Sequence, residues 1–307
     1  MALSRRTLIQ SAGMAPAAAL LAACGGTTQN ASPSSIATAT TRPAGTTAPQ
    51  ATAFPATSHM AKIVQRGKLT AGVKQDQPLF GLLNPRTNQI EGFDIDIVKE
   101  IAKAVFGLAA SADATPRVEL RGVTSAQRIP LLQEGAVDII AATMTITDAR
   151  KLEIDFSEIY YMAGQSLLVP RASTITKIQD MDKADQTICS AQGSTSEQNI
   201  TQFAPAAQKL LFAGYAECVT ALQQGRAQAV STDDIILAGF LEQDPNLKMV
   251  GGQFTQEPYG LGMAKTSTGF QEFVNSEVRK MKTDGRWKQI YTKWLGKVGP
   301  APEPPKA

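Results

Sequence analysis

Two short stretches of the sequence combine hydrogen-bond donors that suit a negatively charged group. Arg150 follows Thr147 and Asp148, which predict a helix N-terminus, and its guanidinium offers two parallel donors to a carboxylate. Gly193-Ser194-Thr195 predicts the start of another helix, where the first backbone N–H groups have no partner within the helix. Both stretches could hold one anion together. The alternatives are a surface ion pair for Arg150 and ordinary capping for Thr145 and Thr195.

Catalytic and metal-binding side chains are scarce by comparison. The 307 residues include one His and three Cys, too few for the converging groups that a zinc site or a Cys–His nucleophile needs. We therefore expect neither a metal nor any other cofactor. A net charge of +3 without a basic cluster gives no electrostatic footprint for nucleic acid. With 43% hydrophobic and 19% charged residues, the chain is also too polar for a polytopic membrane protein.

Residues 1–23 have the order of an export signal. Ser4-Arg5-Arg6-Thr7-Leu8-Ile9 resembles a twin-arginine motif, and the mostly apolar stretch up to Ala23 is shorter than the roughly 20 residues of a membrane-spanning helix. Leu21-Ala22-Ala23-Cys24 resembles a bacterial lipobox, which would make Cys24 the lipidated first residue on the outer face of the cytoplasmic membrane. A signal cleaved elsewhere, with Cys24 lost, is the alternative.

Residues 24–60 are expected to form a disordered tether behind that anchor. From Gly25 to Met60 there is no acidic residue, and Thr, Ala, Pro and Ser dominate, so little apolar surface could be buried to offset the ordering entropy. His59, the only histidine, lies in this stretch, which argues against a catalytic histidine. Residues 298–307 are expected to form a disordered tail.

Between these segments, hydrophobic patterns of strand and helix type alternate in two series. The first series has strands at 68–73, 118–121 and 137–141 with helices at 95–106 and 129–134. The second has strands at 186–190, 210–213 and 227–230 with helices at 194–208 and 216–224. Strands at 167–169 and 260–264 would join or flank the two series, and 269–295 reads as a helical tail. The pattern predicts an α/β protein of two lobes, residues 61–166 with 255–297 and residues 167–254.

Cys189 and Cys218 are the only cysteines of this folded part. One is expected at a strand end and the other in a helix. Because the chain is expected to reach an oxidising compartment, we predict a disulfide between them. Two separate buried thiols are the alternative.

Four segments, in this order and at these spacings, resemble the bacterial solute-binding proteins for polar amino acids, the extracytoplasmic receptors of ABC importers, and specifically their glutamate/aspartate branch. The segments are Gly72-Val-Lys-Gln-Asp-Gln-Pro-Leu-Phe-Gly81, Glu91-Gly-Phe-Asp-Ile-Asp96, Thr124 to Tyr161 with its Thr143-Met-Thr-Ile-Thr-Asp-Ala-Arg150, and Gln192-Gly-Ser-Thr-Ser-Glu197. The resemblance covers residues 61–296. It implies a monomer with the two-lobed periplasmic-binding-protein fold of class II, in which two crossing strands join the lobes and an amino acid is enclosed in the cleft.

The resemblance also implies which residues hold the two charges that all amino acids share. Arg150, helped by Thr145, would hold the α-carboxylate, and the backbone of Thr195 would close over it from the other lobe. Asp233 would hold the ammonium group, with an oxygen from Thr143. As alternatives, Asp233 could be the N-cap of an expected helix at 235–241, and the neighbouring Asp234 competes for either role.

Selectivity is implied at the far end of the pocket. Lys74, Ser125 and Arg128 match positions that contact the side-chain carboxylate of the ligand in the dicarboxylate-binding branch. Two cations facing a neutral amide would lack a counter-charge, so glutamate is predicted to bind more tightly than glutamine. The alternative is that Lys74 and Arg128 are solvated surface charges. The sequence departs from the pattern at two places: Gln75 and Gln77 flank Lys74, near which the glutamine-binding branch stacks an aromatic residue, and Thr232 stands where some relatives carry a histidine. These departures leave glutamate and aspartate both open.

The function implied is capture of glutamate, with aspartate and more weakly glutamine or asparagine as further ligands, and delivery to an ABC importer. Presentation of the ligand to a membrane sensor is an alternative. An enzyme on the same fold is a further alternative, which the absence of histidine from the folded part disfavours. Because the proposed contacts are divided between the lobes, ligand should favour a closed state, with hinges near 167–169 and 252–259.

Overall fold

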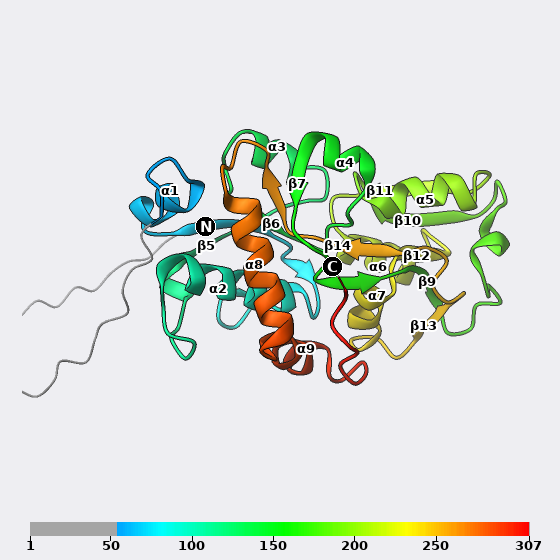
Figure 1. Ribbon diagram of the computed structural model, residues 1–307. Coiled ribbons are helices and arrows are strands. Elements are labelled where there is room, and N and C mark those ends of the chain that lie inside the picture. Colours follow the sequence, from blue (N-terminus) through cyan, green and yellow to red (C-terminus); the bar gives the residue numbers. More distant parts are fainter. Residues whose placement is uncertain (1–53, 307) are drawn as a thin grey trace, which may run out of the picture. The chain divides into compact units, whose positions relative to one another are not determined.

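Two five-stranded sheets form the centres of two lobes, and two short strands cross between them (Figure 1). The computed structural model of the protein describes residues 54–306. The export signal, Cys24 and most of the expected tether lie outside the described residues.

The sheet of lobe 1 has the order β5-β1-β6-β15-β7. β1 runs parallel to β5 and β6, whereas β15 is antiparallel to β6 and β7 and returns from the far end of the chain. The strands are β1 Leu69–Val73, β5 Val118–Gly122, β6 Ile139–Ala141, β7 Ile154–Phe156 and β15 Gly262–Ala264. A small second sheet consists of β2 Asp76–Gln77, β3 Gly81–Asn84 and β4 Gln89–Glu91. Lobe 1 is therefore discontinuous, as the sequence predicts.

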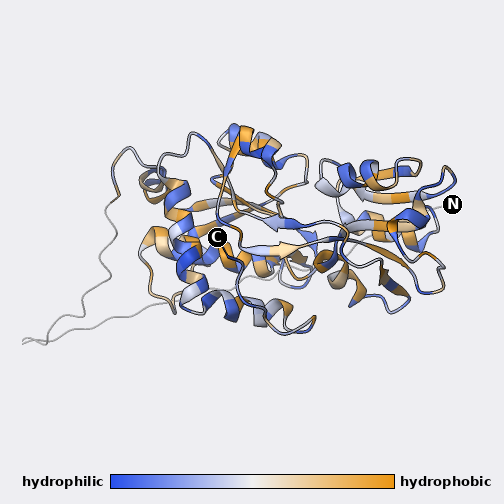
Figure 2. Cartoon of the chain, turned by 45° about the vertical axis from the view of Figure 1, so that its right-hand side comes forward, coloured by the Kyte–Doolittle hydropathy of each residue, from blue (hydrophilic) through white to orange (hydrophobic). Residues whose placement is uncertain are grey.

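Helices cover this sheet, and their outer faces are mainly hydrophilic (Figure 2). They are α1 His59–Arg66, α2 Phe93–Phe106, α3 Arg128–Gln133, α4 Asp148–Glu153, α8 Phe270–Thr283 and α9 Arg286–Leu295, with a 3-10 turn η1 at Thr115–Arg117. In α2, the apolar residues Ile97, Val98, Ile101 and Val105 follow the helical period and are all buried. Gly107 ends the helix at φ +60°, where a residue without a Cβ is favoured.

The sheet of lobe 2 has the order β11-β10-β12-β9-β13. Its strands are β9 Gln165–Pro170, β10 Thr187–Ala191, β11 Gln208–Phe212, β12 Ala229–Asp233 and β13 Leu247–Val250, and its helices are α5 Thr195–Phe203, α6 Tyr215–Gln223 and α7 Asp234–Leu241, with a 3-10 turn η2 at Ile178–Met181. β10 runs parallel to β11 and β12, while β9 is antiparallel to β12 and β13. The parallel strands therefore end at one edge, where α5, α6 and α7 begin.

The crossing segments are β8 Tyr161–Ala163 and β14 Glu257–Tyr259, which pair antiparallel. Two crossing strands are thus confirmed. The hinge predicted at 167–169 is wrong, because these residues lie inside β9 and are paired on both sides in the lobe 2 sheet. The first crossing strand lies earlier in the chain, whereas the second predicted hinge, 252–259, contains β14.

Three predicted boundaries also differ. Helix α1 begins at His59, with the Ser58 hydroxyl accepting the Ala61 N–H, so the end of the expected tether belongs to lobe 1. The helix predicted at 194–208 ends at Phe203, because Pro205 disfavours a helical conformation for the residue before it. The predicted helical tail is divided at Gly285, which has φ +87°. Beyond it, Ala301 in the expected disordered tail packs against the lobe 1 core.

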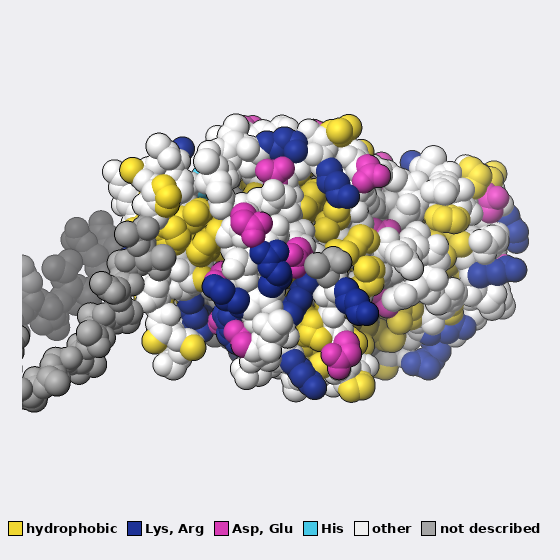
Figure 3. Space-filling view, in the orientation of Figure 1, with side chains coloured by type: hydrophobic (Ala, Val, Ile, Leu, Met, Phe, Trp, Pro, Cys, Tyr) yellow, Lys and Arg dark blue, Asp and Glu magenta, His cyan; other side chains and the backbone are white. Residues whose placement is uncertain are grey.

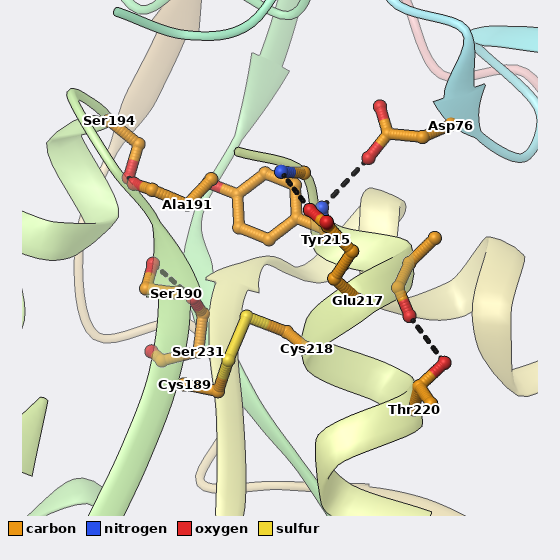
Figure 4. Close-up of a disulfide and its surroundings, with 12 residues drawn as sticks. Asp76, Cys189, Ser190, Ala191, Ser194, Tyr215, Glu217, Cys218, Thr220 and Ser231 are labelled. Atoms are coloured by element: carbon orange, nitrogen blue, oxygen red, sulfur yellow. Dashed lines mark hydrogen bonds between the residues drawn. A yellow bond between two sulfur atoms is a disulfide. The ribbon is translucent and has the colours of Figure 1, made fainter. Parts of the chain in front are cut away.

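The predicted disulfide between Cys189 and Cys218 is confirmed, with a Cα–Cα distance of 5.4 Å (Figure 4). It joins β10 to α6, and both cysteines are fully buried among the apolar residues of lobe 2. The bond therefore ties the sheet of lobe 2 to one of its covering helices.

The charged surface is mixed. On the face in Figure 3, basic and acidic side chains are interspersed. Ion pairs involving α8 and α9 include Arg279 with Glu158 and Arg286 with Glu100. Within residues 54–306, no helix has the length and apolar character needed to cross a membrane.

Candidate functional site

The structure buries all eight residues that the sequence places in a ligand site. In lobe 1 they follow the carboxyl ends of β1, β5 and β6, and in lobe 2 they lie at the ends of β10 and β12, so two strand edges supply them. Their exposed fractions are all 9% or less: Lys74, Ser125, Arg128, Thr143, Thr145, Arg150, Thr195 and Asp233. The alternative of solvated surface charges is therefore wrong for Lys74 and Arg128, and the alternative of a surface ion pair is wrong for Arg150.

Arg150 lies in α4 with its guanidinium directed between the lobes. Its Nη1 donates to the carbonyl oxygen of Thr145 at 2.8 Å, and its Nη2 donates to that of Gly193 in lobe 2 at 3.4 Å. Its backbone N–H donates to the Thr147 hydroxyl, which caps the helix as predicted. Burial lowers the pKa of Arg150, and the charge of Glu257 opposes that shift. The cation is thus held by two carbonyl oxygens, which are weaker partners than a carboxylate.

Thr145 and Thr195 meet across the two lobes. Their hydroxyl oxygens lie 3.4 Å apart, and the Thr145 hydroxyl donates to Oε2 of Glu257 at 2.6 Å. The N-cap of α5 is Ser194, whose hydroxyl accepts the Glu197 N–H, so Thr195 is the first residue of the helix. Capping does not account for the Thr195 side chain, and the open N-terminal turn of α5 lies beside Arg150 and Thr145.

Asp233 is the last residue of β12 and stands at the N-cap position of α7, yet its side chain makes no capping bond. Its Oδ2 accepts a hydrogen bond from the Tyr259 hydroxyl at 2.5 Å, and its buried Oδ1 has no partner among the described residues. Burial, followed by the charge of Glu257, raises the pKa of Asp233 to about 8. A buried oxygen without a partner is suited to a cationic donor.

Asp234 has a local structural role instead. Its Oδ1 accepts N–H groups from Ile235 at 2.8 Å and Gly164 at 3.3 Å, and its Oδ2 accepts the side-chain amide of Gln253 at 2.7 Å. Both of its oxygens are therefore occupied by neighbouring protein groups. This difference separates the two adjacent aspartates, which the sequence left open.

Thr143 has a backbone φ of +44°, unusual for a β-branched residue. Its N–H donates to Oδ2 of Asp94 at 2.9 Å, and its hydroxyl donates to Oε1 of Gln77 at 3.0 Å. Asp94 also accepts the Tyr160 hydroxyl at 2.8 Å, and burial raises its pKa to about 7. The Nε2 of Gln77 is buried without a partner among residues 54–306, so it is a second unpaired polar atom beside the site.

Sequence reasoning missed Gln77 and Asp94 as site-supporting residues. Gln77 follows β1 by a few residues, in the segment that contains Lys74, and Asp94 belongs to the Gly-Phe-Asp-Ile-Asp segment. Both therefore stood inside segments that carried the resemblance. Glu257 was missed as well, and no motif in the sequence marked it.

Lys74, Ser125 and Arg128 form one buried cluster in lobe 1. Nζ of Lys74 donates to the Ser125 hydroxyl at 2.9 Å, and the Arg128 guanidinium donates to the carbonyl oxygens of Ser125 at 3.0 Å and Ala142 at 3.1 Å. Burial and the charge of Arg128 lower the pKa of Lys74 to about 7. Burial and the charge of Arg150 lower the pKa of Arg128 to about 9. The cluster is cationic, but Lys74 can lose its charge near neutral pH.

The lobes also touch at the edge of the cleft. Oδ2 of Asp76, from β2, accepts the backbone N–H of Tyr215 at the start of α6, at 2.8 Å (Figure 4). Gly193 of lobe 2 approaches Ala126 of lobe 1 so closely that a Cβ on Gly193 would lie 2.8 Å from the Ala126 Cα. A cavity of about 260 Å³ lies beside the Asp76 contact, between residues of both lobes. The described state is thus one in which the lobes are closed upon each other.

Within the part of the chain that the structure describes, no group of three or more His, Cys, Asp and Glu side chains could hold a metal ion. The chemistry that the site offers is charge recognition: three cations from lobe 1, one carboxylate from lobe 2, and a helix N-terminus.

Comparison with known proteins gives consistent matches. The sequence model of the bacterial extracellular solute-binding proteins, family 3, matches residues 69–297. The ABC transporter glutamine-binding protein GlnH of Bacillus subtilis (strain 168) is 45% identical over 236 residues, covering 77% of this chain and 84% of that protein. The glutamate-binding protein GluB of Corynebacterium efficiens is 34% identical over 244 residues, covering 76% and 80%. A mutant of ArgBP from T. maritima has a similar fold, with a TM-score of 0.71 and 28% identity over 78% of this chain and 99% of that chain.

Proposed function

Because the chain belongs to the bacterial extracellular solute-binding proteins of family 3, we propose that it captures a free amino acid, glutamine above others, and delivers it to an ABC importer. One observation carries the proposal: a buried Arg150 and a buried Asp233 with an unpaired oxygen come from opposite lobes that are closed upon each other. A family of solute-binding proteins is not one of enzymes, so the expectation that the chain is not an enzyme is confirmed.

The shared groups of an amino acid fit the two charged ends of the site. The α-carboxylate would replace the carbonyl oxygens that now accept from Arg150, and it would gain the N-terminal turn of α5 at Thr195. The α-ammonium would donate to the unpaired Oδ1 of Asp233. Thr143 lies on the lobe 1 side and would supply an oxygen to the same group. Binding would thus give the buried charges of Arg150 and Asp233 an opposite partner each.

The nature of the ligand side chain depends on the cluster of Lys74, Ser125 and Arg128. The sequence predicts glutamate on the assumption that Lys74 and Arg128 are both charged. Burial lowers the pKa of Lys74 to about 7, so this residue can be neutral when an amide faces it. The unpaired Nε2 of Gln77 adds a neutral donor for a carbonyl oxygen. Both features, together with the name of the Bacillus subtilis relative, support glutamine.

Glutamate is the second candidate, since Arg128 keeps its charge and a protonated Lys74 would suit a side-chain carboxylate. The name of the Corynebacterium efficiens relative supports the same ligand. Aspartate would have to reach the same cluster with a side chain shorter by one methylene.

A thermal-shift screen of the purified protein against the twenty amino acids, followed by calorimetry, tests the proposal. Glutamine should give the largest shift, with glutamate next. A larger shift with glutamate would restore the sequence prediction. No shift with any amino acid, in protein unfolded and refolded to remove bound ligand, would overturn the function itself.

Delivery to an importer requires that the protein stay near the membrane. We propose export through the twin-arginine-like signal and lipidation at Cys24, with the chain up to residue 53 as the tether. Membrane fractions should contain a diacylated N-terminal peptide by mass spectrometry, and Cys24→Ser should release the protein. Glutamine uptake into vesicles that contain the permease would distinguish an importer from a sensor.

A further inference from the structure

We propose that Glu257 is a positioning residue that couples the two halves of the site, because it holds Thr145 of lobe 1 and Asn199 of lobe 2 from a crossing strand. This inference rests on the proposed binding of an amino acid between the lobes. Glu257 lies in β14 and is only 3% exposed. Because Glu257 lies in the pair of strands that connects the lobes, it lies in the region about which the lobes must move when they close.

Both oxygens of Glu257 are engaged. Oε2 accepts the Thr145 hydroxyl at 2.6 Å, and Oε1 accepts the Asn199 side-chain amide at 2.9 Å and the Thr255 hydroxyl at 2.8 Å. The same Asn199 amide also donates to Oε1 of Gln165 at the start of β9, at 2.7 Å. One carboxylate thus binds a lobe 1 loop, a lobe 2 helix and its own connecting segment.

These partners are directly linked to the ligand site. Thr145 supplies the carbonyl oxygen that Arg150 contacts, and Asn199 lies four residues after Thr195, on the same face of α5. Because the Thr145 hydroxyl donates a hydrogen bond to Glu257, the lone pairs of the Thr145 hydroxyl oxygen point away from that carboxylate. Glu257 therefore fixes the rotamer of Thr145 and the orientation of the first turns of α5 at the same time.

The charge of Glu257 is unusual for its surroundings. All three of its partners are neutral donors, and among the described residues no Lys, Arg or His lies within 4 Å of its carboxylate. A buried carboxylate without a cation at hydrogen-bond distance is costly, whereas a Gln of the same shape would be cheaper to bury. The charge nevertheless acts on the site, because it opposes the lowering of the Arg150 pKa by burial and adds to the raising of the Asp233 pKa.

Opening of the lobes must break part of this arrangement. Thr145 moves with lobe 1 and Asn199 with lobe 2, so the carboxylate can keep both bonds only in the closed state. The bonds to Glu257 thus favour closure over opening, and a ligand held by Thr145 and Thr195 favours the same state. The two effects are coupled, so loss of Glu257 should weaken ligand binding without removing any ligand contact.

Glu257→Gln tests this coupling, since it keeps the shape. The Asn199 NH2 group donates to both Gln165 and Glu257, so the Gln oxygen must face it and the Gln NH2 group must face Thr145, which reverses that hydrogen bond. We expect the affinity for L-glutamine to fall at least tenfold, almost entirely through faster dissociation. By small-angle X-ray scattering, saturating L-glutamine should also leave the radius of gyration of the variant larger than that of the ligand-bound wild type, because the closed state has lost these bonds.

Glu277→Gln is the matched control, because Glu277 is also buried, at 6% exposure, but lies in α8 and pairs with Lys280 and Arg286 of lobe 1. It should lower the melting temperature and leave affinity and closure unchanged. Affinity within twofold of wild type in a folded Glu257→Gln would overturn the inference. If the wild type binds neither L-glutamine nor L-glutamate, the proposed function fails. In that case the scattering profiles of the ligand-free proteins test the coupling. A larger radius of gyration for Glu257→Gln than for the wild type would support it, and superimposable profiles would overturn it.

Discussion

In lobe 1, the cations of the site are bound mainly by oxygens of their own lobe, the exception being the contact of Arg150 with the Gly193 carbonyl, whereas in lobe 2 the single carboxylate is bound from the crossing strand. Lys74 donates to Ser125, Arg128 to Ser125 and Ala142, and Arg150 to the carbonyl of Thr145. Asp233 accepts from Tyr259 of β14 and keeps one oxygen without a partner among the described residues.

This difference indicates an order of events. Lobe 1 is largely preorganised, because the shorter contacts that orient its cations lie within the lobe and survive opening, so an amino acid can dock there first. Lobe 2 offers Asp233 and the start of α5, which reach the ligand only when the lobes close. Affinity should therefore depend on groups of lobe 1 for the encounter and on groups of lobe 2 for retention.

The largest effect is expected from removing a shared charge on either side. Arg150→Ala or Asp233→Ala should weaken binding of every amino acid by about 3 to 5 kcal/mol, because each leaves a ligand charge buried without its partner. Isothermal titration of the purified variants measures this. If lobe 1 is preorganised, Arg150→Ala should slow association more than Asp233→Ala does.

Arg121→Ala is the control, since Arg121 is an exposed arginine of the same lobe on β5. The affinity of the Arg121→Ala variant for each amino acid should equal that of the wild type. Micromolar binding by a folded Arg150→Ala variant would remove that residue from the site.

The next effect concerns stability, because within residues 54–306 only lobe 2 contains a disulfide. Replacing both Cys189 and Cys218 with Ala opens a loop whose ends are 29 residues apart. The free energy of unfolding should fall by about 3 to 4 kcal/mol in the chain-entropy view. Urea denaturation, followed by far-UV circular dichroism, measures the loss, and reduction of the wild type should reproduce it. Equal stability of oxidised and reduced wild type would contradict the prediction.

The sequence predicted regular elements well where the period was clear. The spacing of Ile95, Val98, Ile101, Ala102 and Val105 marks α2, and the alternation of strands and helices gives both lobes. It could not give the hinge, because β8 and β9 follow each other with only Gly164 between them and both read as extended. Which of them leaves the sheet is decided by pairing with β14 and β12, which are distant in sequence.

The site was predictable where charge and helix starts coincide, as at Arg150 and Thr195. Glu257 was not, since its partners Thr145 and Asn199 come from different lobes and lie at no regular spacing from it. The sequence likewise treated Lys74 as a fixed charge. Its lowered pKa arises from burial and from Arg128, which only the folded chain brings near.

A smaller effect should appear in selectivity as pH changes. Lys74, with a pKa of about 7, becomes charged as pH falls from about 8.5 to 6, beside Arg128, Asp76 and Arg150. A charged Lys74 favours a carboxylate over an amide, so the affinity ratio of glutamate to glutamine should rise as pH falls. Effects of pH on Asp233 act on the ammonium group of both ligands and cancel in the ratio. Titrations with both ligands at several pH values measure the ratio of their affinities. In Lys74→Met, this ratio should be independent of pH.

Burial of Lys74 should also lower the free energy of unfolding of the protein. The pKa of Lys74 is lower in the folded protein than its usual value of 10.5, so the unfolded chain binds more protons between these values. Stability should therefore decrease as pH falls through this window, with the full cost below about 7. Lys74→Met should raise the melting temperature of the ligand-free protein at pH 7, and an unchanged or lower value would show that Lys74 is not strained by burial.

The smallest effect is expected at the edge of the cleft, where lobe 1 reaches lobe 2 through Asp76. A Cβ on Gly214 would lie 2.3 Å from Oδ2 of Asp76, so Gly214→Ala should displace the carboxylate from the Tyr215 N–H. The backbone of Gly214 has φ −133°, which alanine adopts without strain, so the change acts on the contact and not on the fold. Loss of one helix-capping bond across the lobes should destabilise the closed state by roughly 1 kcal/mol, which lowers glutamine affinity about fivefold.

Asp76→Ala should have a similar effect, and the double variant should bind no more weakly than either single variant, because both changes remove the same bond. Gly299→Ala serves as the control, since a Cβ there meets nothing within 4 Å. Additive losses in the double variant would show that Asp76 and Gly214 act separately, and the comparison between a self-contained lobe 1 and a lobe 2 that is completed only by closure would then no longer extend to this edge.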